Sequence, residues 1–144
     1  MKKRLSLLLL PLVTLLLEIL PYGAVCNFAR PATDGSIGHF RELYSYFDLT
    51  PFGYANFAPF LTAIITCLIF VLLTIYCIKG NINTAIKAKN ILYIAIVLSL
   101  GPLIFGITYF SLVGGLITLS LIAELLLLQF IIKNSNKDSN LTKR

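Results

Sequence analysis

The chain has 144 residues, of which 58% are hydrophobic and 12% are charged, and its net charge is +6. Because soluble domains carry about 25% charged residues, this composition excludes an ordinary soluble protein, which would expose more apolar surface than water tolerates. The basic residues lie in short flanks between apolar stretches rather than on one broad face, so nucleic acid is not expected as a partner.

Four long apolar stretches are predicted to be membrane-spanning helices. They cover residues 5–22, 58–78, 91–107 and 112–132. A hydrocarbon core about 30 Å thick requires about 20 helical residues, and about 17 to 25 are tolerated. The predicted fold class is therefore an all-α membrane protein. We expect a single four-helix transmembrane domain over residues 1–133 and a disordered, basic cytoplasmic tail over residues 134–144.

The first stretch also has features of a secretory signal peptide, because a basic start and an apolar core precede Gly23-Ala24-Val25-Cys26. Cleavage after Ala24 would place Tyr22 where a small residue is preferred, and Val25 stands where a lipoprotein signal needs a small residue. The apolar run over residues 5–20 is also long for a signal core. We therefore predict a retained helix, which N-terminal sequencing of the membrane-extracted protein would test.

The outer segment, residues 23–57, is the longest piece between apolar stretches. It passes through a turn-forming run over residues 31–36, which includes Asp34-Gly35. After this turn, Phe40, Leu43, Tyr44 and Phe47 recur at helical spacing, and Ser36 is a suitable N-cap. This pattern predicts a short amphipathic helix over residues 37–47 that lies in the outer membrane interface.

Aromatic residues are concentrated in the same segment and form its candidate interaction site. The candidates are Phe40, Tyr44, Phe47, Phe52 and Tyr54. One interpretation is an interfacial belt, because amphipathic rings prefer the headgroup level. The other is a cap that docks a partner protein, since a segment of this length is longer than a simple connection between two helices requires.

Two acidic residues lie inside apolar stretches, Glu18 in the first and Glu124 in the fourth. A carboxylate at the centre of a spanning helix costs about 2.5–3.5 kcal/mol on insertion scales, so such residues usually have a partner or a function. Either they join helices through hydrogen bonds, or they bind a proton or another cation. Glu18 lies nearer the outer side and Glu124 nearer the inner side, so a single site holding both is not expected. The polar candidates for contact with Glu18 are Arg30, Arg41, His39 and Asn27, and those for Glu124 are Tyr93, Asn90, Gln129 and Lys79.

The third stretch contains a helix breaker and a small-residue motif. Gly101-Pro102 is predicted to break the helix, because proline removes a backbone hydrogen bond and clashes one turn back. Ala95 and Ser99, four residues apart, are small enough to let two helices approach closely.

The distribution of basic residues predicts the topology. Of the 12 Lys and Arg residues, only Arg30 and Arg41 lie in the outer segment. The others flank the opposite ends of the four stretches, and basic flanks resist translocation. We therefore predict a multi-pass protein of the cell membrane with both termini in the cytoplasm.

No group of residues indicates catalysis. The chain has a single histidine, no phosphate-binding loop and no CxxC pair, so neither an enzyme nor a metal or other cofactor is expected. Cys26, on the outer side, is predicted to be free or to pair with another molecule.

The leading functional hypothesis is a non-catalytic accessory or partner-binding membrane component. The alternative is a small ion- or proton-coupled transporter that uses Glu18 or Glu124. The expected partners are the lipid bilayer and either a second copy or another membrane protein.

Overall fold

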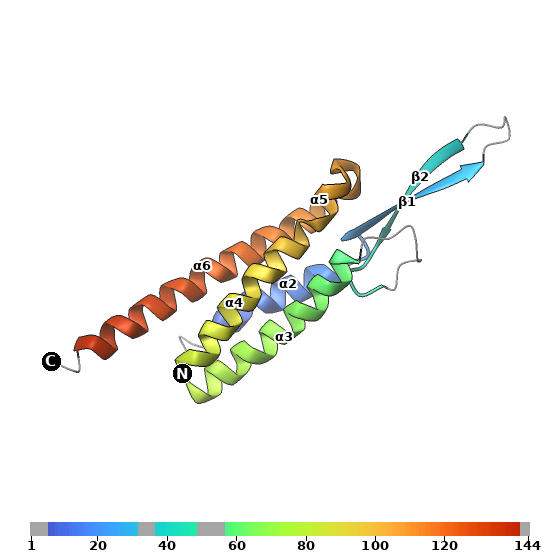
Figure 1. Ribbon diagram of the computed structural model, residues 1–144. Coiled ribbons are helices and arrows are strands. Elements are labelled where there is room, and N and C mark those ends of the chain that lie inside the picture. Colours follow the sequence, from blue (N-terminus) through green and yellow to red (C-terminus); the bar gives the residue numbers. More distant parts are fainter. Residues whose placement is uncertain (1–5, 32–36, 49–56, 142–144) are drawn as a thin grey trace.

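The computed structural model of the protein describes residues 6–31, 37–48 and 57–141. Its helices are η1 (Ser6–Leu8), α2 (Leu9–Ile19), α3 (Ala58–Lys79), α4 (Ile82–Ser99), α5 (Gly101–Phe105), η2 (Ile107–Tyr109) and α6 (Leu112–Leu141). Its strands are β1 (Ala24–Pro31) and β2 (Ile37–Tyr44). The long helices lie side by side in one elongated bundle, and the two strands form a hairpin that projects from one end of it (Figure 1). The described chain begins and ends at the opposite end of the bundle.

Three helices of the described chain are long and apolar enough to cross a membrane. They cover Ala58–Lys79, Ile82–Phe105 and Leu112–Ser135. These helices indicate a membrane-embedded protein. The first helical segment, Ser6–Ile19, is apolar but shorter. At 1.5 Å per residue it is about 21 Å long, against about 30 Å for a hydrocarbon core.

The distribution of side chains over the bundle also fits a lipid environment. Large apolar side chains are exposed on α2, α3, α4 and α6, for example Leu9, Ile78, Val97 and Leu119. Several buried positions are instead polar, among them Thr14, Thr62, Thr66, Ser99 and Thr118. An apolar exterior around polar interior groups is favourable only where lipid replaces water.

The break predicted at Gly101-Pro102 is confirmed, because α4 ends at Ser99 and α5 begins at Gly101. Ala95 and Ser99 are fully buried where α4 packs against α6. The Thr118 hydroxyl of α6 donates a hydrogen bond to Ser99 Oγ at 3.0 Å. The small-residue motif therefore lies in a close helix contact, as its spacing predicts.

The third helix begins earlier than the predicted residue 91. Gly80 ends α3 with φ of 67°, a left-handed conformation that glycine adopts without strain, and its N–H donates to the Tyr76 carbonyl at 2.8 Å. Asn81 then caps α4 by accepting a hydrogen bond from the Asn83 N–H at 3.0 Å. The two caps place α3 and α4 in an antiparallel hairpin and start α4 at Ile82.

The last helix also differs from the expected boundary, because α6 continues to Leu141, into the segment predicted to be a disordered tail. Extending a helix that already exists requires no new nucleation, so a polar continuation can remain helical.

The helix predicted over residues 37–47 is wrong. Residues Ile37–Tyr44 form β2, which pairs antiparallel with β1 from Ala24↔Tyr44 to Pro31↔Ile37. Phe28 and Phe40 face each other across the pair, with ring centroids 5.3 Å apart and an interplanar angle of 23°. Backbone pairing and this cross-strand stack, both between residues distant in sequence, outweigh the local helical pattern. The expected N-cap Ser36 lies outside the described residues.

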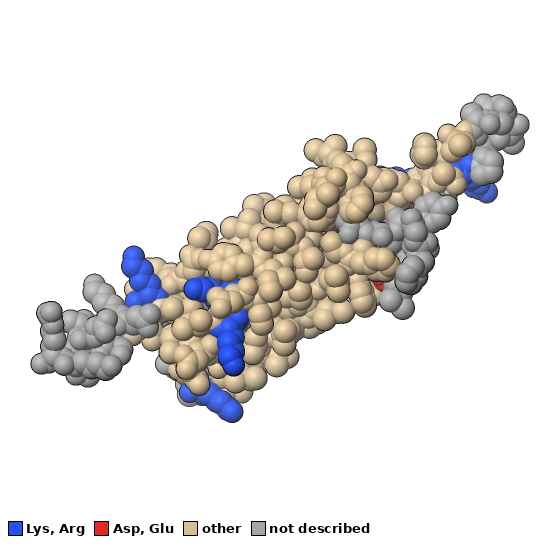
Figure 2. All heavy atoms as spheres, in the orientation of Figure 1, with Lys and Arg blue, Asp and Glu red and all other residues tan. Residues whose placement is uncertain are grey.

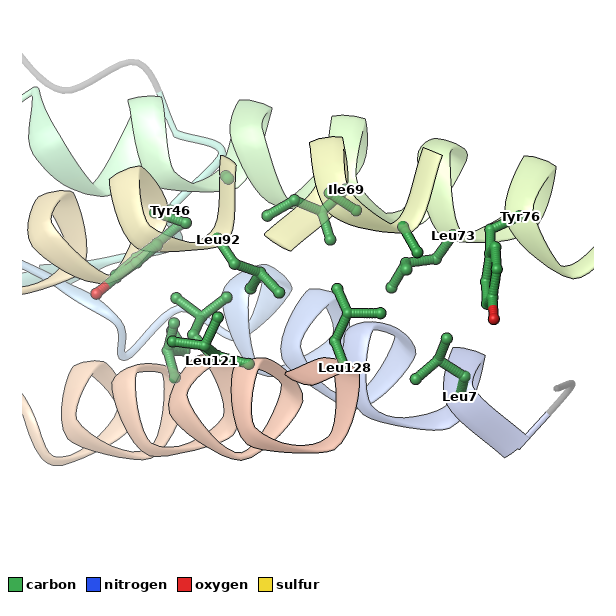
Figure 3. Close-up of a cluster of buried hydrophobic side chains, with 14 of the residues drawn as sticks. Leu7, Tyr46, Ile69, Leu73, Tyr76, Leu92, Leu121 and Leu128 are labelled. Atoms are coloured by element: carbon green, nitrogen blue, oxygen red, sulfur yellow. The ribbon is translucent and has the colours of Figure 1, made fainter. Parts of the chain in front are cut away.

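The core of the bundle is largely apolar and is closed at the hairpin end by one aromatic ring. Leu7, Leu73, Tyr76 and Leu128 fill the half nearer the chain termini, while Leu92 and Leu121 lie nearer the hairpin (Figure 3). Tyr46, which follows β2, inserts at the hairpin end and is only 1% exposed. The hairpin is therefore anchored to the bundle through its base.

Candidate functional site

Glu18 and Glu124 are both fully buried in the bundle. They lie on α2 and α6, which run antiparallel and pack against each other (Figure 1). Between the two acids, the Thr14 and Ser120 hydroxyls form a hydrogen bond of 2.7 Å that joins the helices. Glu18 follows Thr14 by one turn, and Glu124 follows Ser120 by one turn.

The structure brings the two carboxyl groups into one region. Helical side chains lean toward the N-terminus of their own helix, so on antiparallel helices Glu18 and Glu124 lean toward each other. Glu18 also acts electrostatically on Glu124. The expectation that a single site would not hold both acids considers only positions along each helix, whereas the reach and direction of the side chains bring the two groups toward each other.

The hydrogen bonds of this carboxyl pair are incomplete. Thr66 Oγ1 of α3 donates to Glu18 Oε1 at 2.8 Å. Within the part of the chain that the structure describes, Glu18 Oε2 and both carboxyl oxygens of Glu124 have no hydrogen-bond partner. A buried polar atom without a partner costs about 1–3 kcal/mol, so each such group requires an explanation.

The partners expected for the two acids are not the ones found. A threonine of α3, rather than a polar residue of the outer segment, contacts the Glu18 carboxyl group. Tyr93 and Gln129, both expected near Glu124, instead bond to each other, with the Gln129 amide donating to the Tyr93 hydroxyl at 2.7 Å. The sequence offered little to distinguish Thr66, since threonine is common in spanning helices and often bonds to its own backbone.

The base of the hairpin contacts the same region from outside. The Glu18 backbone carbonyl accepts hydrogen bonds from the Tyr46 N–H at 2.9 Å and from the Ser45 hydroxyl at 3.1 Å. Burial, together with the nearby Glu18, raises the pKa of Tyr46 above its ordinary value, so its phenol is neutral. A neutral ring therefore closes the hairpin end of the core directly beside Glu18.

The aromatic interaction candidates lie partly on the exposed hairpin. Phe40 is 41% exposed and Phe47 is 37% exposed. Tyr44 is half-buried and donates a hydrogen bond to the Glu42 carboxylate at 2.5 Å. Phe52 and Tyr54 lie outside the described residues. A role for these residues in binding stays a prediction.

A shallow pocket of about 340 Å³ lies where the hairpin meets the start of α6. Its lining residues are Tyr22, Arg41, Leu43, Ser111, Leu112 and Val113. The Arg41 guanidinium donates to the Phe110 carbonyl at 3.3 Å, and the Ser111 hydroxyl donates to the Gly23 carbonyl at 2.5 Å. These two bonds fix the hairpin against the loop before α6, so the pocket has defined walls.

Cys26 is buried in β1 opposite Glu42 and has no disulfide partner among the described residues. Burial raises the pKa of its thiol, and the Glu42 carboxylate raises it further. At pH 7–8 Cys26 should therefore contain less thiolate than a free cysteine, whose pKa is about 8.5, and should react more slowly with N-ethylmaleimide. Replacing Glu42 by glutamine removes one cause, so the rate–pH curve should move to lower pH.

The measurement is the labelling rate of Cys26 between pH 6 and 10 in a chain carrying Cys67→Ser and Cys77→Ser. Unfolded protein serves as the control, because its thiol should react at the ordinary rate. Identical curves with and without Glu42→Gln would show that Glu42 does not act on this thiol.

Comparison with models of known protein families, with curated proteins and with solved structures finds no match to this chain.

Proposed function

We propose that this chain is a non-catalytic, multi-pass membrane component that binds a partner protein through its projecting hairpin. The observation that carries the proposal is the exposure of β2, where every residue except Tyr44 is exposed. An isolated two-stranded hairpin is at best marginally stable in water. A hairpin that extends away from the bundle therefore gains stability if another protein covers it.

The chemistry of the hairpin defines the kind of partner. No third strand pairs with β1 or β2 in the described chain, so both outer edges offer unpaired backbone groups. An extended segment of another protein can add to such an edge, with its side chains entering neighbouring pockets. The pocket beside Arg41 and Leu43 lies at the base of this edge and suits a mainly apolar side chain.

The proposed topology has four spans with both termini in the cytoplasm. Basic side chains gather at the bundle end opposite the hairpin, where the described chain begins and ends (Figure 2). Lys79 lies there in the last turn of α3. Basic residues on the cytoplasmic side support this orientation. The proposed first span is α2. This helix is short, but it packs against α3 and α6 and exposes Leu9, Leu16 and Ile19.

Site-specific photocrosslinking in intact cells tests the partner proposal. A photoreactive residue at Phe40 should give an adduct with one defined membrane or surface protein, identified by mass spectrometry. The matched control is Val97, which is 69% exposed on the bundle and should crosslink to lipid. If Phe40 yields only copies of the chain or lipid, the proposal is wrong.

A second function, small ion- or proton-coupled transport, is favoured by the buried Glu18–Glu124 pair. Glutamine at either position keeps the size and hydrogen-bonding capacity of the side chain but removes its charge. In proteoliposomes, a transporter should lose pH-driven ion flux with Glu18→Gln or Glu124→Gln. Unchanged flux in both variants would exclude this function.

A further inference from the structure

The charge of the carboxyl pair depends on how many protons it holds. Two ionised carboxylates close together in a low-dielectric site repel each other strongly, so such pairs commonly retain at least one proton. With both groups protonated the pair is neutral, and the loss of one proton leaves a charge of −1 on Glu18 and Glu124 together. Among the described residues, no lysine, arginine or histidine acts electrostatically on either carboxyl group. A single positive charge would therefore neutralise the pair.

The oxygen atoms at the pair suit a small, hard cation. Three buried carboxyl oxygens, one of Glu18 and two of Glu124, have no hydrogen-bond partner in the described chain. The Thr14 and Ser120 hydroxyl oxygens lie one helical turn before Glu18 and Glu124, respectively. The Thr66 hydroxyl contacts the Glu18 carboxyl group. Carboxylate and hydroxyl oxygens are the ligands that hard cations prefer.

The number of acidic ligands favours a monovalent ion. The described residues contain no group of three or more His, Cys, Asp or Glu side chains placed to hold a metal ion. A divalent cation would leave a net positive charge on a pair that keeps its shared proton, whereas a monovalent cation would leave none.

We propose that Glu18 and Glu124 form one binding site for a small monovalent cation of sodium or lithium size. The exchange reaction is balanced when the pair starts with both carboxyl groups protonated. One carboxyl O–H bond then breaks, its proton passes to water, and the resulting carboxylate coordinates the cation, so the charge of the site does not change. This inference rests on the same residues as the transport function, but it concerns equilibrium binding and does not require movement across the membrane.

Two other groups near the carboxyl pair could in principle release a proton, and their ordinary pKa values decide whether they do. Cys67 of α3 and Tyr46 of the hairpin base also interact electrostatically with Glu18. Thiols and phenols ordinarily titrate near pH 8.5 and 10, so both are protonated at pH 6–7. Among these interacting groups, only the carboxyl pair can therefore release a proton in that range.

Polar side chains also lie on the hairpin side of the pair. Thr62 and Thr66 are buried on successive turns of α3 between its hairpin-side end and Glu18. The opposite half of the core, around Leu7, Leu73 and Leu128, is apolar (Figure 3). The carboxyl pair therefore has hydroxyl groups on its hairpin side and apolar side chains on the other.

Cation-linked proton release from the full-length protein tests the proposal. Sodium or lithium chloride is added to the purified protein in detergent at pH 6.5, in weak buffer with a pH-indicator dye, and choline chloride gives the same ionic strength. Wild type should release about one proton per chain with sodium or lithium and none with choline.

The two carboxyl variants should respond more weakly. Loss even of a group that only orients a metal ligand costs about 10–100-fold in affinity, so Glu18→Gln and Glu124→Gln should each weaken the response at least about tenfold. Glu42→Gln, the same substitution on the exposed hairpin, should respond like wild type.

No release from wild type, or unchanged release from both buried-site variants, overturns the proposal. If those variants do not fold, the wild-type protein is tested alone. Carbodiimide modification of Glu18 and Glu124 is then measured by peptide mass spectrometry in sodium chloride and in choline chloride. Sodium should slow the modification relative to choline. Equal modification with both salts, or none with either, overturns the proposal. Because neither measurement involves flux, cation binding can fail or succeed separately from transport.

Discussion

Replacing Tyr46 by alanine is expected to lower the free energy of unfolding by about 3–5 kcal/mol, the usual cost of removing a large buried aromatic ring. Tyr46 is among the largest fully buried side chains in the described chain and closes the hairpin end of the core. Thermal and denaturant unfolding in detergent measure the effect. Tyr46→Phe keeps the ring and should cost less than about 1.5 kcal/mol. Equal losses in the two variants would contradict the role assigned to the ring.

Gly23 offers an independent check on the same contact. A Cβ atom at this position would lie 2.8 Å from the Tyr46 ring, so Gly23→Ala should destabilise the wild-type protein. In the Tyr46→Ala background the ring is absent, and the same glycine substitution should cost much less. The coupling between the two changes then measures the ring contact directly.

Replacing Glu124 by leucine is expected to raise the free energy of unfolding by about 1–3 kcal/mol, because it removes two buried oxygens that lack partners. Leucine has a similar size and fills the position with apolar atoms, and an apolar group of similar shape avoids the cost of burying polar atoms without partners. The same variant should lose cation-linked proton release. Unfolding in detergent and the dye measurement provide both values.

Glu18→Leu is the matched comparison. It also removes an acceptor that Thr66 uses, although the Thr66 hydroxyl still lies 3.0 Å from the Thr62 carbonyl. The gain in stability should therefore be smaller than with Glu124→Leu. A destabilised or dissociated Glu124→Leu protein would instead show that Glu124 holds a neighbouring helix or subunit.

The helices with uninterrupted apolar runs are the part of the fold that the sequence predicts best. Residues 58–78 match α3, and residues 112–132 match most of α6, because length and hydropathy define such helices. The start of α4 is missed because Lys87, Lys89 and their polar neighbours lower the local hydropathy. Gly80-Asn81 was the available signal, since it joins a helix stop to an N-cap.

The hairpin was missed because its pattern is ambiguous. Phe40 and Tyr44 are four residues apart, an even spacing that places them on one face of either a helix or a strand. The decision depends on pairing with β1, which local periodicity does not reveal. Asp34-Gly35 between two short apolar runs was the signal for a hairpin.

The sequence identifies the two acidic residues of the candidate site, but it does not show that they lie near each other. Glu18 and Glu124 are conspicuous because acids are rare in spanning helices. Their proximity depends on the antiparallel packing of α2 and α6 and on the direction of each side chain, neither of which is encoded locally. Thr66 completes the contact from a third helix.

Ser45 and Tyr46 both donate hydrogen bonds to the Glu18 backbone carbonyl. These two bonds connect the base of the hairpin directly to the residue that carries one of the buried carboxyl groups. A ligand that shifted the hairpin base would have to break or reorient these bonds and would displace the end of α2 that carries Glu18. Thermodynamic linkage then requires reciprocity, so any change in cation affinity caused by a protein on the hairpin is matched by an equal change in protein affinity caused by the cation. The occupancy of the hairpin and the occupancy of the buried acids would then depend on each other through the hairpin base.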